Sequence, residues 1–240
     1  MHWWFPTNAS SYGGEIDKLF LIILYITGAV FIIVEVALLY FLFKYRQRAG
    51  RKAAYIEGST RAEIIWTTIP AIIVICLGVF SQPLWSLIKE PENIPAGAIT
   101  YGVTAKQFEW HIRYPGPDGK LDTDDDFEKR NELHVVVNTN VSVRLRSEDV
   151  IHSFFIPNFR LKQDAVPGLT ILAWFRATRT GEFELGCAEL CGLGHYRMRA
   201  RVIVQTQDEF DRWQATQVAP TPSAPVAATG SASTRGRSAR

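Results

Sequence analysis

Two arrangements of hydrophobic positions divide the chain. Near the N-terminus, apolar residues form two long runs, from Leu19 to Phe43 and from Ile64 to about Ile88. A transmembrane helix needs about 20 apolar residues, so each run is long enough to cross a bilayer. From Ile99 onward, apolar and polar residues alternate, which is typical of half-buried β-strands. The pattern therefore predicts a membrane α-hairpin followed by an all-β domain.

The connection between the two runs is strongly basic. It carries the stretch K-Y-R-Q-R-A-G-R-K at 44–52 and Arg61, whereas residues 1–17 contain no lysine or arginine. The positive-inside rule assigns such a loop to the cytoplasm, so we predict both chain ends and the β domain on the outer side. The first run is longer than the apolar core of a signal peptide, and we expect it to remain as a membrane span.

These patterns predict four parts in order. They are an outward tail at 1–18, a hairpin at 19–90 with its cytoplasmic loop at 44–62, a β domain at 98–218, and a disordered tail at 219–240 that is rich in Pro, Ala, Ser and Thr. Within the β domain, the predicted strands are 99–112, 132–137, 141–146, 170–177, 182–187 and 200–205. Many short strands favour a sandwich or barrel. A capping box at Thr206 predicts a short helix through Trp213.

The segment from Gly186 to Met198, with the sequence G-C-A-E-L-C-G-L-G-H-Y-R-M, carries soft metal ligands. Two thiols (Cys187 and Cys191), an imidazole (His195) and a thioether lie within it, and His152 lies upstream. This set suits copper. A mononuclear blue-copper site needs only one cysteine, so the second thiolate indicates a pair of metal ions bridged by sulfur.

Two alternatives use the same residues. A Cys2His2 zinc site needs the same four strong ligands, although zinc has no use for the thioether of Met198. A disulfide between Cys187 and Cys191 would close a loop of only three intervening residues and would leave both histidines unexplained.

Three motifs resemble subunit II of the haem-copper cytochrome c oxidases: H-S-F-F-I-P at 152–157, D-A-V-P-G at 164–168 and C-A-E-L-C-G-L-G-H-Y-R-M at 187–198. The resemblance implies a cupredoxin-like Greek-key barrel that holds a dinuclear copper centre, CuA. The implied ligands are the side chains of His152, Cys187, Cys191, His195 and Met198, and the backbone carbonyl of Glu189. It further implies a magnesium ion held by the Glu189 side chain at the boundary with the catalytic subunit, and haem only in that partner.

Two carboxylates fall in or beside the predicted spans. Glu63 opens E-I-I-W-T-T-I-P at 63–70, which resembles the entrance of the family's K-pathway for protons; a plain helix-terminal carboxylate, favoured by the dipole, is the alternative. Glu35 lies inside the first span, where an ionisable residue is a functional candidate by default. The alternative for Glu35 is a protonated or hydrogen-bonded side chain that faces a partner subunit.

An aromatic stretch and an acidic loop concern the electron donor. Q-F-E-W-H-I-R-Y at 107–114 resembles the family segment that receives electrons, but Phe108 stands at the usual tryptophan position and Trp110 follows it. For at least one of these two rings, packing in the core of the β domain is as good an explanation as electron entry. The loop at 115–128 lacks the order of a calcium loop. With Glu148 and Asp149, it is a candidate for attracting a basic redox partner.

The resemblance implies the subunit that accepts electrons in a respiratory oxidase, which reduces dioxygen to water and translocates protons. Its partners would be catalytic subunit I, other oxidase subunits and membrane lipid, in a bacterial-type inner membrane. The chain has no C-x-x-C-H, so cytochrome c or a membrane complex that contains it would be the donor. With a net charge of +2 and no basic aromatic patch, nucleic-acid binding is not indicated. Alternatives are the CuA subunit of a nitric oxide or nitrous oxide reductase, and a membrane-tethered copper carrier.

Overall fold

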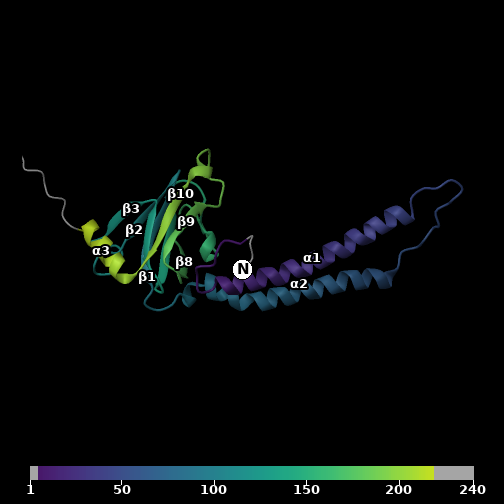
Figure 1. Ribbon diagram of the computed structural model, residues 1–240, viewed down its shortest axis with the longest axis horizontal. Coiled ribbons are helices and arrows are strands. Elements are labelled where there is room, and N and C mark those ends of the chain that lie inside the picture. Colours follow the sequence, from purple (N-terminus) through teal and green to yellow (C-terminus); the bar gives the residue numbers. More distant parts are fainter. Residues whose placement is uncertain (1–4, 219–240) are drawn as a thin grey trace, which may run out of the picture.

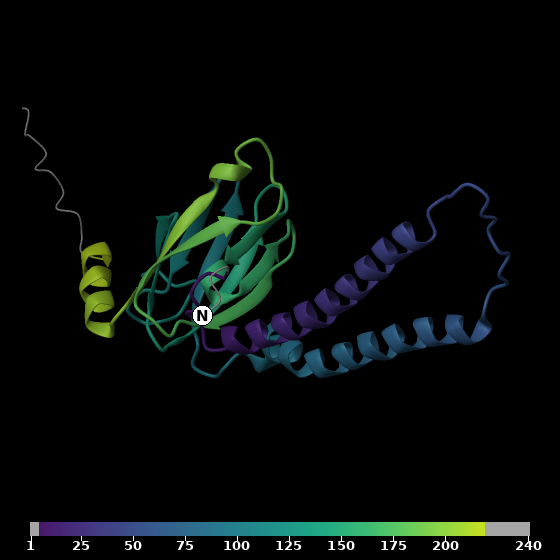
Figure 2. The ribbon, with the colours of Figure 1, turned by 45° about the vertical axis from the view of Figure 1, so that its right-hand side comes forward.

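The protein consists of a long helical hairpin joined to a β-sandwich (Figure 1). The computed structural model describes residues 5–218, so the predicted tail at 219–240 lies outside the described residues. Helices α1 (Gly13–Lys44) and α2 (Thr60–Lys89) are both long and apolar enough to span a membrane. They lie side by side next to the sandwich and diverge toward the basic loop (Figures 1 and 2). Their large apolar side chains are mostly exposed, as expected for helices in contact with lipid.

The sandwich contains two five-stranded sheets, in the orders β3-β2-β1-β5-β8 and β4-β10-β9-β6-β7. Its strands are β1 (Ile99–Lys106), β2 (Glu109–Tyr114), β3 (Phe127–Arg130), β4 (Glu132–Val136), β5 (Asn140–Ser147), β6 (His152–Ile156), β7 (Leu161–Ala165), β8 (Ile171–Arg176), β9 (Gly181–Cys187) and β10 (Arg199–Gln205). Short helical turns are η1 (Pro91–Asn93), η2 (Pro157–Phe159) and η3 (His195–Arg197), and α3 (Gln207–Val218) ends the described chain. The predicted fold class, a membrane hairpin followed by an all-β domain, is confirmed.

Alternating burial explains why the sheets face each other. Along β1, Tyr101, Val103 and Ala105 are buried while the residues between them are partly exposed. On β2, the inward positions are Trp110, Ile112 and Tyr114. Because side chains alternate across a strand, these residues fill the space between the sheets. The core thus begins directly behind the turn that joins β1 to β2.

Several strand predictions were wrong. Segment 99–112 is not one strand but an antiparallel hairpin in which Lys106 pairs with Glu109. Strands β3 and β7 were missed because FEKR and LKQDA are largely polar, and β6 was missed because HSFFI was treated only as part of the motif H-S-F-F-I-P. Helix α3 runs to Val218, beyond the predicted end at Trp213. Polar strands at sheet edges are paired by their backbones, which hydrophobic periodicity does not report.

The N-terminal segment before α1 is built into the sandwich. Ala9 donates its N–H to Asn158 O at 2.9 Å and accepts the N–H of Thr178 at 2.8 Å. The Tyr12 hydroxyl donates to Trp174 O at 3.0 Å. Ala9 and Tyr12 are both buried in the core cluster. The segment therefore fixes the start of α1 against β8.

Polar contacts also join the hairpin to the sandwich. The Arg160 guanidinium donates to the Asp17 carboxylate of α1 at 2.7 and 3.1 Å. At the end of α2, the Trp174 indole donates to Leu87 O at 3.0 Å, and Lys89 donates to Lys162 O at 2.7 Å. Both membrane helices are thus attached to the β domain by their ends.

Candidate metal centre

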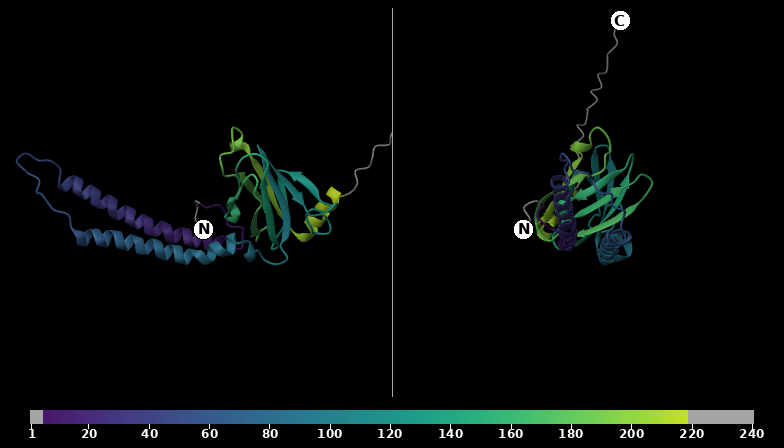
Figure 3. Two further views of the ribbon diagram at one scale, coloured as in Figure 1. Left: turned by 180° about the vertical axis from the view of Figure 1, so that it is seen from behind. Right: turned by 90° about the vertical axis from the view of Figure 1, so that its right-hand side faces the viewer.

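The loop between β9 and β10 carries the cysteines and projects from one end of the sandwich, away from α3 (Figure 3). Its base is closed by a hydrogen bond from Cys187 N to Met198 O at 3.1 Å. His152 is the first residue of β6, and β6 pairs with β9 so that Phe154 lies opposite Cys187. Strand pairing therefore brings His152 next to the loop although 35 residues separate it from Cys187.

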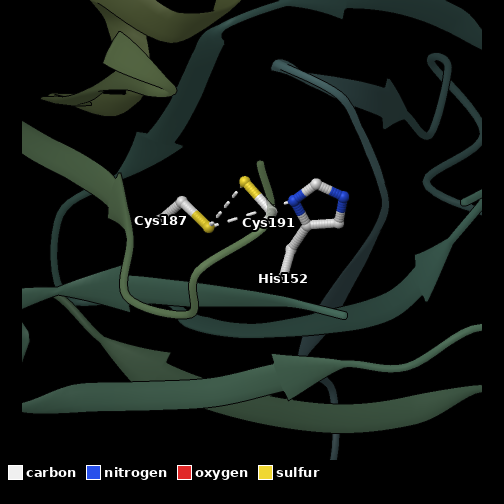
Figure 4. Close-up of side chains that lie close together, drawn as sticks. All are labelled: His152, Cys187 and Cys191. Carbon is white, nitrogen blue, oxygen red and sulfur yellow. Dashed lines mark hydrogen bonds between the residues drawn. The ribbon is translucent and has the colours of Figure 1, made fainter. Parts of the chain in front are cut away.

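The two thiols lie between the two imidazoles. Cys187 Sγ is 3.8 Å from Cys191 Sγ and 3.9 Å from His152 Nδ1. On the other side, Cys191 Sγ is 3.7 Å from His195 Nδ1. In Figure 4, the side chains of His152, Cys187 and Cys191 point toward one another. These three form the group of potential metal ligands detected among the described residues.

Two weaker donors complete the set. Met198 Sδ lies 3.8 Å from Cys191 Sγ, and Glu189 O lies 3.2 Å from Cys187 Sγ. A structural zinc site would leave this thioether without a role. The distance between the sulfurs far exceeds the roughly 2.05 Å of a disulfide bond, and both cysteines are free. The donor set fits copper better than either alternative.

The two thiols differ in acidity. Burial opposes ionisation of Cys187, but contact with His152 and with backbone N–H groups outweighs it and lowers its pKa to about 6. Burial and the neighbouring negative charge of Cys187 raise the pKa of Cys191 to about 11. Adjacent thiols lose their protons in sequence because the first charge opposes the second. A bound cation would favour release of the second proton.

Asp149 contacts the site, a role that the sequence analysis missed. Its Oδ1 lies 2.8 Å from His152 Nε2. Asp149, predicted as one of the carboxylates that attract a basic redox partner, is thus also hydrogen-bonded within the domain, and its part in docking stays a prediction. The available signal was its place three residues before a candidate ligand, within the turn that leads into β6.

Phe108 and Trp110 lie at different depths beside the site. The Phe108 ring packs against the metal loop so closely that a methyl group added at Gly194 would lie 2.4 Å from it. Trp110 is fully buried, and its ring centroid is 6.2 Å from that of His152. Phe108 is partly exposed. Trp110 thus lies in the core beneath the metal loop, whereas Phe108 reaches the surface.

Comparisons with known proteins place the chain. The description "Cytochrome C oxidase subunit II, transmembrane domain" matches residues 1–84, and "Cytochrome C oxidase subunit II, periplasmic domain" matches residues 117–207. The alternative cytochrome c oxidase subunit 2 of Bradyrhizobium diazoefficiens is 33% identical, over 90% of this chain and 84% of the relative. The chain belongs to the cytochrome c oxidase subunit II family.

Other matches have the same description. Cytochrome c oxidase subunit 2 of Thermostichus vulcanus is 32% identical over 89% of this chain and 78% of the relative. The crystal structure of the periplasmic domain of subunit II of cytochrome oxidase of Bradyrhizobium japonicum is 34% identical and covers 52% of this chain and 96% of its own, with a TM-score of 0.47.

The protein is thus the electron-accepting subunit of an oxidoreductase complex and has other oxidase subunits as partners. Its β domain is periplasmic, and the family carries CuA there. The alternatives of a nitrogen-oxide reductase or a copper carrier are not favoured, because the matched relatives are cytochrome c oxidase subunits.

In this subunit II, Glu63 lies far from the metal loop. It occupies the first turn of α2, after the N-cap Ser59, at the end of the hairpin remote from the sandwich. The Glu63 N–H donates to Ser59 O at 3.0 Å, and Glu63 is exposed to solvent. The carboxylate is open to solvent where α2 begins, which both interpretations of Glu63 require.

The acidic loop at 115–128 lies at the opposite end of the subunit's sandwich from Phe108. It follows β2, whose six residues begin directly after Phe108. A strand of that length spans about 20 Å, more than twice the Debye length of about 8 Å at physiological salt. Two of its carboxylates are also engaged, Asp122 with Arg144 at 2.8 Å and Asp125 with Thr123 at 2.6 Å. The distance of this loop from Phe108 thus argues against it as the surface that attracts the electron donor.

We therefore expect neutralisation of Asp124, Asp125 and Asp126 to leave donor association almost unchanged. Stopped-flow measurement of association against ionic strength should give the slope of the unmodified oxidase, because screened charges contribute little to steering. Glu109→Gln, next to Phe108, serves as the comparison and should reduce the slope. A flattened slope in the triple variant would restore the loop as a docking surface.

Proposed function

We propose that this subunit holds CuA through the side chains of His152, Cys187, Cys191, His195 and Met198 and the backbone carbonyl of Glu189. The supporting observation is that two thiols lie between two imidazoles. Each imidazole Nδ1 is within 3.9 Å of the nearer sulfur, and the two sulfurs are 3.8 Å apart. A copper pair held by these residues would supply the uptake and release of single electrons. The donor is cytochrome c or a membrane complex that contains it, and the acceptor is haem in subunit I.

Each residue has a separate task in this proposal. Cys187 and Cys191 supply thiolates, and their loop is closed by the bond from Cys187 N to Met198 O. His152 is held from the buried side of the site, whereas His195 lies on the partly exposed turn η3. The exposed Glu189 has its carbonyl beside Cys187 and its carboxylate free for magnesium at the boundary with subunit I.

The fold supports a proposal for the arrangement in the membrane. Residues 7–12 pack on the sandwich, so the N-terminal segment and the β domain lie on one side and the basic loop on the other. We propose a bacterial-type inner membrane, with both chain ends and the copper domain on the periplasmic side. The exposed apolar faces of α1 and α2 contact lipid and the oxidase subunits. Oxygen reduction and proton translocation then occur in the assembled complex.

Metal analysis of the full-length subunit tests the proposal. Protein purified from its native membrane should contain two coppers per chain. Its paramagnetic resonance spectrum should show one unpaired electron shared equally between them, because both ions are bound by the same two thiolates. Cys191→Ser should abolish this sharing, while Cys76→Ser, on α2, should preserve it. One copper per chain, or zinc, would reject the proposal.

A further inference from the structure

The second nitrogen of His152 meets a carboxylate inside the domain. His152 is fully buried, and its Nε2 lies 2.8 Å from Asp149 Oδ1. An ionised carboxylate can only accept hydrogen bonds. Nε2 must therefore carry the hydrogen of this bond. In the neutral imidazole, this leaves Nδ1 with its lone pair directed at the site, 3.9 Å from Cys187 Sγ.

Asp149 is itself fixed by the backbone. Its Oδ2 accepts the N–H of Gln107 at 2.7 Å, and its Oδ1 accepts that of Val150 at 2.7 Å. These bonds to two backbone N–H groups, from two separate turns, set the orientation of the carboxylate.

Gln107 extends this network to the loop that carries the thiols. Its backbone bonds to Asp149 and its side-chain Nε2 donates to Cys191 O. One residue in the β1–β2 turn therefore connects the carboxylate behind His152 with the backbone of Cys191. Within residues 5–218, no carboxylate bonds to the His195 ring, whose Nδ1 lies 3.7 Å from Cys191 Sγ.

We propose that Asp149 is a positioning residue for the metal centre, which fixes the Nε2–H form of His152 and thereby presents Nδ1 as the ligand atom. A carboxylate bonded to a ligating imidazole sets its ring orientation and increases its basicity. Because His195 lacks such a partner among residues 5–218, we expect the two imidazoles to differ in donor strength. The inference rests on the proposed copper site, but the state of the ring can be measured without metal.

The first test is nitrogen NMR of the metal-free, full-length subunit labelled in histidine. The chain contains five histidines, so subtraction of a His152→Gln spectrum assigns the ring. Across a pH titration, neutral His152 should carry its hydrogen on Nε2. Asp149→Ala should populate both forms, and Glu184→Gln, an exposed carboxylate beside Arg199, should not change the spectrum. A hydrogen on Nδ1 in the unmodified protein would overturn the proposal.

The second test measures copper retention. Loss of a carboxylate behind a ligand costs about 10- to 100-fold in metal affinity, so Asp149→Ala should release copper to a chelator that much more readily. Asp149→Asn keeps one oxygen that can accept from His152 and Val150 but places an NH2 group against the Gln107 N–H, so it should retain copper better than Asp149→Ala. The reduction potential of the copper centre in Asp149→Asn should still rise, since a negative charge is lost. Unchanged potential and retention in both variants would contradict the proposal, whereas absence of a copper pair in the unmodified protein would reject only the proposed function.

Discussion

Replacement of Glu63 by glutamine is expected to lower oxidase turnover by about 100-fold, the lower end of the range attributed to a lost proton-transfer group. Glutamine preserves the shape and hydrogen bonding of the side chain but cannot ionise. The exposed position of Glu63 at the start of α2 allows its carboxylate to collect protons from the solvent on the side of the basic loop. Steady-state oxygen consumption measures the effect, while stopped-flow measurement should show that electron uptake from the donor remains fast.

Glu57→Gln is the matched control for this experiment. Glu57 is an exposed carboxylate six positions before Glu63, in the loop that leads into α2. Its loss should leave turnover unaffected. If Glu63→Gln also retains full turnover across the pH range, Glu63 serves only as a favourable charge at the helix N-terminus.

Removal of the Phe108 ring should slow electron uptake from bound cytochrome about tenfold, equivalent to roughly 1.4 kcal/mol in the barrier. The ring lies on the metal loop at Gly194 and reaches the surface, so it offers an apolar contact between a haem edge and the centre. Electron transfer depends on distance and packing more than on an indole N–H. Phe108→Ala should therefore slow electron uptake, and Phe108→Leu should slow it less. Both variants should keep the copper spectrum of the unmodified protein.

Trp110 requires a gentler substitution than alanine. It is fully buried, and truncation of such a side chain typically costs about 3–5 kcal/mol of stability. Trp110→Phe keeps most of the packing and removes the indole. Phe127→Ala, at the far end of the sandwich, controls for general loss of stability. If Phe108→Ala leaves the rate of electron uptake unchanged and Trp110→Phe lowers it, then Trp110 is the residue that receives electrons.

Hydrophobic periodicity was sufficient for the membrane hairpin because the lipid-facing runs are long and almost free of charge. It was insufficient for β3 and β7, whose sequences FEKR and LKQDA contain few apolar residues. Those strands are set by backbone pairing with β2 and β6, which is a property of the whole sheet. The turn at Gln107, which divides the predicted strand 99–112, was missed for a similar reason. Apolar and polar residues alternate almost without interruption on both sides of this turn.

The candidate ligands could be named from the sequence because five of them lie in one short loop with distinctive chemistry. The network behind His152 could not, because Asp149 and Gln107 come from different turns and acquire their roles only through folding. The same holds for the acidic loop, whose charge is evident in the sequence but whose place at the far end of β2 is not. Composition identifies donor atoms, and the fold determines which of them meet.

The attachment of residues 7–12 to β8 also sets an order for biosynthesis. Ala9 bonds to Asn158 and Thr178, so it must wait for residues made much later. At about 5–20 residues per second, this delay is on the order of ten to thirty seconds. During that time, the first span must already have sent its N-terminus across the membrane, and the second must return the chain to the same side. Completion of the sandwich edge therefore depends on correct insertion of both spans, and a chain in which only one span crossed would hold Tyr12 on the opposite side of the membrane from the edge that buries it.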